Sequence, residues 1–173
     1  AKFIAKQLIK IGIKLSKIIV IPNESEEIIN TIMEFHKKFT YVFTTGGIGP
    51  THDDITSESI AKAFKKKYIT DPRVLKILKE YYPKEKLNEG RKKMAKVPAD
   101  CELILNPLTG APGFKINNVY FLPGVPMIMK KMFRSLIKNL KNSKPKKIST
   151  INTNLFESIL VQILPPFLTN FLK

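Results

Sequence analysis

The chain has 173 residues, of which 43% are hydrophobic, so it is long enough to bury one core and lacks the composition typical of disordered proteins. Its single cysteine, Cys101, excludes an intramolecular disulfide and a zinc site built from several cysteines. The formal net charge of +16 comes almost wholly from lysines spread along the chain, which is typical of solvated faces. Nucleic-acid binding is the less favoured interpretation, because no aromatic stacking platform or recognition motif accompanies these lysines.

The first forty residues predict a helix, a strand and a second helix. Ile4, Leu8 and Ile11 recur at helical spacing before Gly12, which predicts a helix over residues 1–11. The β-branched run within Lys17–Pro22 predicts a buried strand. The apolar stripe of residues 23–39 then predicts a helix capped by Asn23 or Ser25.

The stretch from Thr44 to Thr56 reads TTGGIGPTHDDIT and follows a predicted strand over residues 41–45. Closely spaced glycines let the backbone approach a ligand, and exposed amides before a helix form an anion site. The residues expected to bind such a ligand are Thr45, Gly46, Gly47, Gly49, Pro50 and Thr51. Asp53 and Asp54 supply the hard oxygen ligands that Mg²⁺ prefers, so both are predicted as metal ligands and catalytic groups.

The alternative for this stretch is a tight turn before a helix that Asp54 or Thr56 caps. Neither the GxxxxGK[ST] nor the GxGxxG nucleotide-binding spacing is present. His52 is interpreted either as a ligand or proton carrier, or as a loop residue that positions a phosphate.

The middle of the chain predicts helices at residues 57–67, 72–83 and 85–96, then a strand at residues 102–105. Thr70-Asp71-Pro72 is typical of a helix start. Arg91 is predicted to contact phosphate because its planar guanidinium suits bidentate binding. The alternative is that the last two helices are amphipathic cover elements.

A second glycine turn follows another predicted buried strand, Val119–Leu122. Pro123-Gly124-Val125-Pro126 opens a helix predicted over residues 127–140, which repeats the anion-site pattern, so Pro123, Gly124 and Pro126 are predicted ligand-binding residues. Residues 141–147 are predicted as a linker and residues 148–151 as an edge strand. The apolar stretch from Leu155 to Leu172 is interrupted by Glu157, Gln162 and Pro165-Pro166, so it is not predicted to span a membrane.

The motif from Thr44 to Thr56 closely resembles the signature of the MoaB/Mog molybdopterin-binding domain family. With His52-Asp53-Asp54 it is most similar to the CinA-like branch, the amino-terminal domain of competence/damage-inducible protein A, and to the equivalent domain of FAD synthases. Downstream residues continue the resemblance in order: Asn88, Arg91, Met94-Ala95, Val97-Pro98, Asn106-Pro107, residues 111–114 and residues 122–126.

The resemblance implies an α/β fold, a three-layer α/β/α domain with a mostly parallel sheet. That family begins with a strand, which is apparently missing before the first helix of this chain. The expected organisation is therefore one amino-terminally truncated domain over residues 1–152 and a tail of uncertain structure over residues 153–173.

The resemblance also implies binding of a nucleotide or pterin phosphate, with metal-dependent hydrolysis of ADP-ribose-type dinucleotides by Mg²⁺, Mn²⁺ or Co²⁺ as the favoured activity. The alternatives are molybdopterin binding or adenylyl transfer in molybdenum cofactor biosynthesis, or a binding module without turnover. Asn23 stands where the family usually has an aspartate. The missing carboxylate favours a binding module without turnover. The expected setting is cytoplasmic, as a dimer or trimer without nucleic acid or membrane partners.

Overall fold

The computed structural model describes residues 1–49, 51–83, 88–140, 154 and 159. Pro50, the predicted linker, the predicted strand at residues 148–151 and nearly all of the tail therefore lie outside the described residues. The elements are α1 (Lys2–Lys10), α2 (Ser25–Lys38), β1 (Val42–Thr45), α3 (Thr56–Ala63), β2 (Tyr68–Thr70), α4 (Pro72–Tyr81), α5 (Glu89–Lys93), β3 (Lys96–Pro98), β4 (Glu102–Ile104), β5 (Gly113–Ile116), β6 (Val119–Leu122), α6 (Pro126–Leu136) and the 3₁₀ turn η2 (Ile137–Asn139).

The main sheet has four described strands in the order β1-β6-β5-β4. Only β1 and β6 are parallel, whereas β6 with β5 and β5 with β4 are antiparallel. The predicted α/β class is confirmed, with a mixed sheet in place of a mostly parallel one. The reason is the two-residue turn at Asn117-Asn118, because so short a connection joins only antiparallel strands, and Asn117 takes the positive φ of +52° that such turns need.

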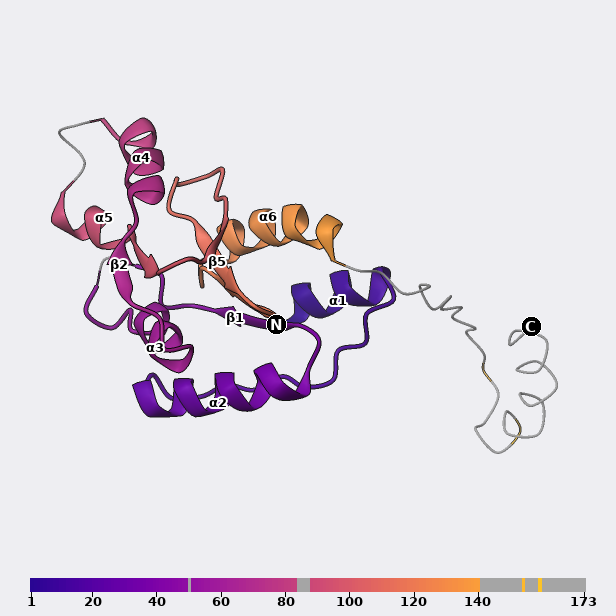
Figure 1. Ribbon diagram of the computed structural model, residues 1–173. Helices are drawn as coiled ribbons and strands as arrows, with labels where there is room; N and C mark the ends of the chain where they lie inside the picture. Colours follow the sequence, from indigo (N-terminus) through magenta and orange to yellow (C-terminus); the bar gives the residue numbers. More distant parts are fainter. Residues whose placement is uncertain (50, 84–87, 141–153, 155–158, 160–173) are drawn as a thin grey trace.

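Helices cover both faces of this sheet, so the predicted three-layer arrangement is confirmed (Figure 1). On one face, Ile4 and Leu8 of α1 and Phe133 of α6 pack against Tyr120 and Leu122 of β6. On the other face, residues of α2 and α3 pack against β1, β5 and β6, among them Ile28, Ile32, Ile60, Val42, Phe114 and Phe121. The sheet is therefore buried on both sides, which explains the unbroken apolar run of β6.

Two features near the amino terminus differ from the sequence prediction: one predicted strand does not form, and one helix begins at a different residue. The segment from Lys17 to Pro22 forms no strand, and its side chains Ile18, Ile19 and Val20 are 55%, 45% and 94% exposed. No described strand is paired with it, so its β-branched residues lack the neighbouring strand that a sheet would provide. Helix α2 begins after Glu24, without a side-chain cap, and not after Asn23 or Ser25.

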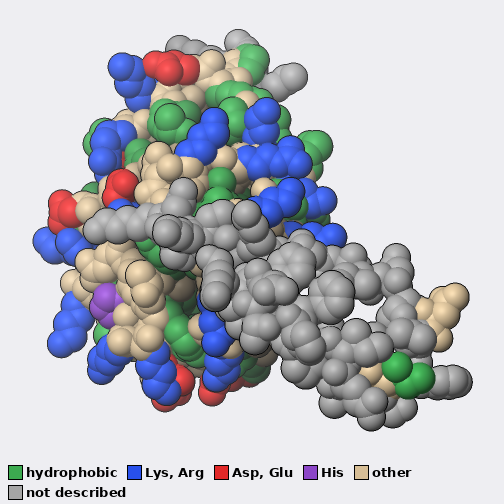
Figure 2. All heavy atoms as spheres, turned by 90° about the vertical axis from the view of Figure 1, so that its right-hand side faces the viewer, with side chains coloured by type: hydrophobic (Ala, Val, Ile, Leu, Met, Phe, Trp, Pro, Cys, Tyr) green, Lys and Arg blue, Asp and Glu red, His purple; other side chains and the backbone are tan. Residues whose placement is uncertain are grey.

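The lysines lie on many parts of the surface. Figure 2 shows Lys and Arg side chains scattered among hydrophobic and polar groups over the visible face, rather than gathered in one field. Several of those described pair with acids, such as Lys62 with Glu58 at 2.9 Å and Lys115 with Glu102 at 2.7 Å.

No helix within the described ranges has the length and apolar character that crossing a bilayer requires.

A small second sheet, β2 with β3, carries α4 and α5 to one side of the main sheet (Figure 1). The predicted start of α4 is confirmed, since Pro72 is in its first turn and the Asp71 carboxylate accepts a hydrogen bond from the Arg73 amide at 2.8 Å. The predicted helix over residues 85–96 is shorter: α5 spans only five residues, and Lys96 already belongs to β3.

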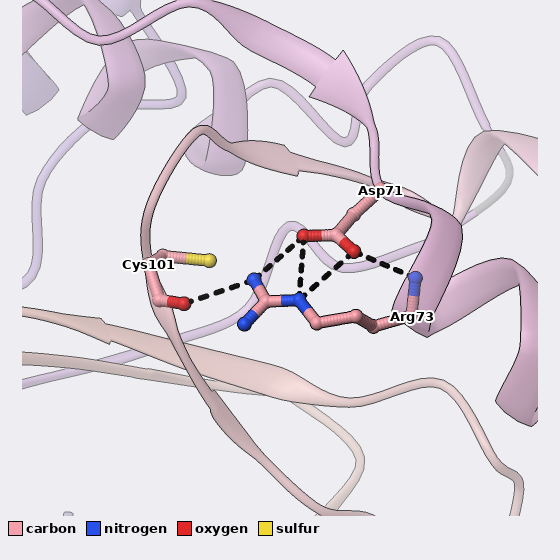
Figure 3. A network of polar contacts seen from close by, with 3 residues as sticks. All are labelled: Asp71, Arg73 and Cys101. Atoms are coloured by element: carbon pink, nitrogen blue, oxygen red, sulfur yellow. Dashed lines mark hydrogen bonds and ion pairs between the residues drawn. The ribbon is translucent and has the colours of Figure 1, made fainter.

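The Asp71 carboxylate also holds the Arg73 guanidinium, which reaches the strand connection at Cys101 (Figure 3). Arg73 Nη2 donates to Asp71 Oδ2 at 2.7 Å and to the Cys101 carbonyl at 3.1 Å. The hydrogen bond from Arg73 lowers the pKa of the buried Asp71. Burial, more than any neighbouring acid, raises the pKa of the Cys101 thiol to about 11, which fits a structural cysteine.

Candidate functional site

The two glycine turns lie against each other. Strands β1 and β6 pair in parallel up to Thr45 and Leu122, so the turns that follow them leave the same edge of the sheet. A Cβ atom on Gly124 would lie 3.1 Å from the Cα atom of Gly46. The turns therefore pack directly together, and a ligand would lie across both of them rather than in a crevice between them.

Glycine is required in the first turn for two different reasons. Gly46 and Gly47 have φ values of +109° and +73°, which side chains disfavour. In addition, a Cβ atom on Gly47 would collide with the Thr56 side chain, and one on Gly49 would collide with the Asp54 carboxylate. The backbone is thus held close to the start of α3, with no side chain above it.

The two predicted carboxylates have different surroundings. Asp54 is half-buried and its Oδ2 atom accepts hydrogen bonds from the Thr51 amide at 3.0 Å and the Thr51 hydroxyl at 2.6 Å. Asp53 is exposed, and its main-chain oxygen accepts a hydrogen bond from Asn23 Nδ2 at 2.8 Å. Asn23 therefore reaches the loop through its side-chain amide, which contacts the main chain of Asp53.

The alternative for this loop is wrong in its helix cap, although a turn is present. Helix α3 follows Ile55, and no side-chain hydrogen bond caps it. The Asp54 carboxylate instead closes the turn at Thr51, three residues earlier. In the described structure, Asp54 therefore fixes the loop, and its Oδ2 atom is used by the two hydrogen bonds from Thr51.

Lys93, a cation of α5, touches the glycine loop. Its ammonium group donates to the main-chain oxygen of Thr51. Arg91, which is predicted to contact phosphate, places its guanidinium over the Tyr82 ring, 4.4 Å from the centroid. Asn88 accepts a hydrogen bond from the Arg91 amide and so caps α5. Sequence reasoning missed Lys93 because one lysine among so many carries no distinguishing signal.

A small pocket of about 10 Å³, room for roughly one water molecule, lies beside the loop between Gly47, Asp54, Tyr68, Lys93 and Lys96. Burial raises the pKa of Tyr68. A hydrogen bond with Ser57 lowers this pKa, and the nearby Glu58 and Asp54 carboxylates raise it, so the net shift is upward. The phenol therefore stays protonated at neutral pH. The pocket is too small for a nucleotide, so a ligand would contact the loop from its exposed side.

The second turn adds an uncapped helix start. Helix α6 begins at Pro126 after Val125, without a side-chain hydrogen bond at its cap. Gly124 and Pro126 are exposed, whereas Pro123 is buried. Because the first amides of a helix have no intrahelical partner, they are available to an anion there.

The described residues could bind a divalent ion only if a bound ligand, such as a phosphate, supplied further oxygen atoms to the ion. No group of three His, Cys, Asp or Glu side chains that could hold a metal is found among them. Mg²⁺ commonly binds through one or two carboxylates together with substrate phosphates and water. Asp53 and Asp54 match that smaller donor set, since Asp53 is exposed and Asp54 has one oxygen not held by Thr51.

The structure brings part of the predicted site together. Gly46, Gly47 and Gly124 form the paired turns, while Thr51, Asp53 and Asp54 form the adjoining loop. Arg91 points to Tyr82, and Pro50 lies outside the described residues. His52 is exposed at the end of the loop.

The chain is similar to known proteins over most of its length. The family described as "Probable molybdopterin binding domain" matches residues 1–142. A "CinA-like protein" of Flavobacterium psychrophilum is 37% identical over 75% of this chain and 33% of its own length. A "Putative competence-damage inducible protein" of Clostridium botulinum is 33% identical over 98% of this chain and 44% of its own length.

A solved structure shares the fold. The crystal structure of the protein CinA with unknown function from Thermoplasma acidophilum matches with a TM-score of 0.73 and 32% identity, over 80% of this chain and 84% of that one. The chain spans only a part of the two curated relatives named above, 33% and 44% of their lengths. On this evidence the chain belongs to the molybdopterin-binding domain family and is similar to its CinA-like members.

Proposed function

We propose that this domain binds the phosphate end of a nucleotide or pterin across the paired glycine turns and, with a divalent ion, hydrolyses the pyrophosphate of ADP-ribose-type dinucleotides. The observation that supports binding is the contact between Gly124 and Gly46, which places the uncapped start of α6 beside the first glycine turn. Main-chain amides from both turns can then face one phosphate group.

The carboxylate proposed to act on water is Asp53. Hydrolysis forms a bond between a water oxygen and phosphorus, breaks the bond from that phosphorus to the bridging oxygen, and leaves two phosphate monoesters. Asp53 is exposed and can accept the proton that the water loses, whereas Asp54 Oδ2 is held by Thr51. When bound by Asp53 and Asp54, a divalent ion would offset phosphate charge and lower the pKa of water.

Lys93 would assist the same ligand electrostatically. Its ammonium lies on the main-chain oxygen of Thr51, next to the loop, so it adds positive charge where a pyrophosphate would sit. The substitution Lys93→Met is expected to raise the KM for a dinucleotide.

The test is a screen of ADP-ribose, FAD and NAD with Mg²⁺, Mn²⁺ or Co²⁺, following release of AMP. Asp53→Asn is expected to lower the rate by a factor of about 100 or more. The matched control is Asp100→Asn, which changes an exposed aspartate that pairs with Lys66 away from the loop. No hydrolysis of any of the three compounds, or equal rates in both variants, would contradict the proposed reaction.

A second candidate is a binding module without turnover, and Asn23 is the observation in its favour. An amide there donates to the Asp53 main-chain oxygen but supplies no carboxylate. Asn23→Asp separates the candidates: new hydrolysis would indicate an enzyme weakened at this position, and unchanged ADP-ribose binding without hydrolysis would indicate a binder. Tighter binding of molybdopterin than of ADP-ribose, or release of pyrophosphate from ATP in its presence, would favour the molybdenum cofactor role.

A further inference from the structure

The small pocket beside the glycine loop has one apolar and one polar wall. The apolar wall is formed by Val97, Pro112, Phe114 and Phe121, and the polar wall by Asp54, Ser57, Tyr68 and Lys93. The volume of about 10 Å³ is close to what a single water molecule needs. A water stays in such a pocket only where about two to four polar groups can bond to it, so the polar wall decides whether water binds there.

Tyr68 brings a phenol hydroxyl from β2 to the polar wall. Burial raises the pKa of Tyr68, and a hydrogen bond with Ser57, which is buried near the start of α3, lowers it. A bond that lowers the pKa of a phenol favours the phenolate, so the Ser57 hydroxyl is the donor and the Tyr68 oxygen is the acceptor. The proton of the Tyr68 hydroxyl can therefore be donated to another acceptor.

The Asp54 carboxylate lines the same pocket and acts on the Tyr68 phenol through its charge rather than through a direct hydrogen bond. Its Oδ2 atom accepts two hydrogen bonds from Thr51. A carboxylate oxygen has two lone pairs, so Oδ1 can accept a hydrogen bond and still bind an ion. One water between Tyr68 and Asp54 would supply that hydrogen bond.

Lys93 adds a further partner for a water at this place. Its ammonium group donates one proton to the main-chain oxygen of Thr51 and carries two more. A water in the pocket can therefore accept hydrogen bonds from Tyr68 and Lys93 and donate one to Asp54. The hydrogen bonds then run in one direction, from the Ser57 hydroxyl to the Asp54 carboxylate, and each donor meets an acceptor.

We propose that Tyr68 is a positioning residue, which holds the Asp54 carboxylate through one water bound in this pocket. With Oδ2 bonded to Thr51 and Oδ1 to the water, the carboxylate can no longer rotate, and a lone pair of Oδ1 remains for a divalent ion. Hydrogen bonds to a metal-binding carboxylate typically change metal affinity by about 10–100-fold. The part that concerns the ion rests on the proposed function, whereas the water and its hold on Asp54 do not.

The first test needs no metal or nucleotide. A crystal structure of the full chain is expected to show one water within about 3.2 Å of Tyr68 Oη and Asp54 Oδ1, and Tyr68→Phe should lose it. In solution, hydrogen exchange at the Thr51 amide, which donates to Asp54, should become severalfold faster in Tyr68→Phe. The matched control is Tyr120→Phe, which removes the hydroxyl of a buried tyrosine packed with Leu122 and Phe133 and should leave this amide unchanged.

The second test separates positioning from a purely structural role. Mn²⁺ binding in the presence of ADP-ribose, followed by electron paramagnetic resonance, should weaken about tenfold in Tyr68→Phe and less in Ser57→Ala. The double variant should bind no more weakly than Tyr68→Phe, because Ser57 acts only through the phenol. Ser57→Thr keeps the hydroxyl and should restore the affinity.

The outcomes distinguish this inference from the proposed function. A pocket without water, a direct hydrogen bond from Tyr68 to Asp54, unchanged exchange at Thr51 in Tyr68→Phe, or additive losses in the double variant would overturn the inference. A bound water and faster exchange at Thr51, in a protein that does not bind Mn²⁺ with ADP-ribose, would support the hold on Asp54 and contradict only the proposed function.

Discussion

Gly124 and Gly46 approach so closely that a methyl group on Gly124 would lie 3.1 Å from the Gly46 Cα atom. Gly124→Ala is therefore expected to push the two turns apart by a few tenths of an ångström and to weaken ADP-ribose binding about tenfold, or about 1.4 kcal/mol. Isothermal titration calorimetry measures this. Val125→Ala, at the exposed neighbouring position, is the control and should leave affinity unchanged. Equal affinities in all three proteins would show that the turns do not share a ligand.

Thr51 and Asp54 together fix the loop that carries the carboxylates. Thr51→Val removes the hydroxyl that donates to Asp54 Oδ2 at 2.6 Å but keeps the amide that donates at 3.0 Å. Because this loop is exposed, we expect a stability loss of at most about 1 kcal/mol, with faster hydrogen exchange at residues 51–54 and weaker Mn²⁺ binding in the presence of ADP-ribose. Thr51→Ser retains the hydroxyl and should behave like the unmodified protein. A serine variant as impaired as the valine variant would contradict this role.

The buried Asp71 carboxylate makes stability depend on pH. Arg73 holds the pKa of Asp71 below its ordinary value, so the stabilisation is present above about pH 4 and is lost as pH falls through the lowered pKa. Asp71→Asn keeps an oxygen for the helix cap and loses the ion pair, for an expected cost of about 1–3 kcal/mol at pH 7.

Urea unfolding of both proteins at pH 7 and pH 3 measures the effect. The difference in free energy of unfolding between them should shrink at pH 3, because below its ordinary pKa the Asp71 carboxyl takes up a proton more readily in the unfolded chain than in the native protein. A difference that stays constant over this range would show that the ion pair contributes nothing.

Cys101 should react with thiol reagents only after unfolding. Burial raises its pKa to about 11, so almost no thiolate is present in the native protein at pH 8. Native labelling by a disulfide reagent is expected to be at least about tenfold slower than in denaturant. Equal labelling rates in native and denatured protein would refute this prediction.

The raised pKa of Cys101 also affects stability. Because the native pKa exceeds the unfolded value, the stabilisation from this thiol is present below about pH 8.5 and is lost as pH rises towards 11.

The sequence predicted the elements whose signals are local. Asp71-Pro72 placed the start of α4, and the glycines before α3 and α6 placed the two turns. It failed where the outcome depends on a neighbour. The residues from Lys17 to Pro22 have strand propensity but no strand partner within the described part of the chain, and the direction of β5 was decided by a two-residue turn. In the site, the sequence held no signal for Lys93, one lysine among many, which the fold brings to the glycine loop.

The parallel pair β1 and β6 joins Val42 to Val119, residues 77 positions apart. During synthesis at about 5–20 residues per second, β1 leaves the ribosome several seconds before its only described neighbour in the sheet. Throughout that interval both of its edges are open to other nascent chains. Slow assembly and a need for chaperones are the expected biosynthetic cost of a sheet whose first described strand waits for its last described one.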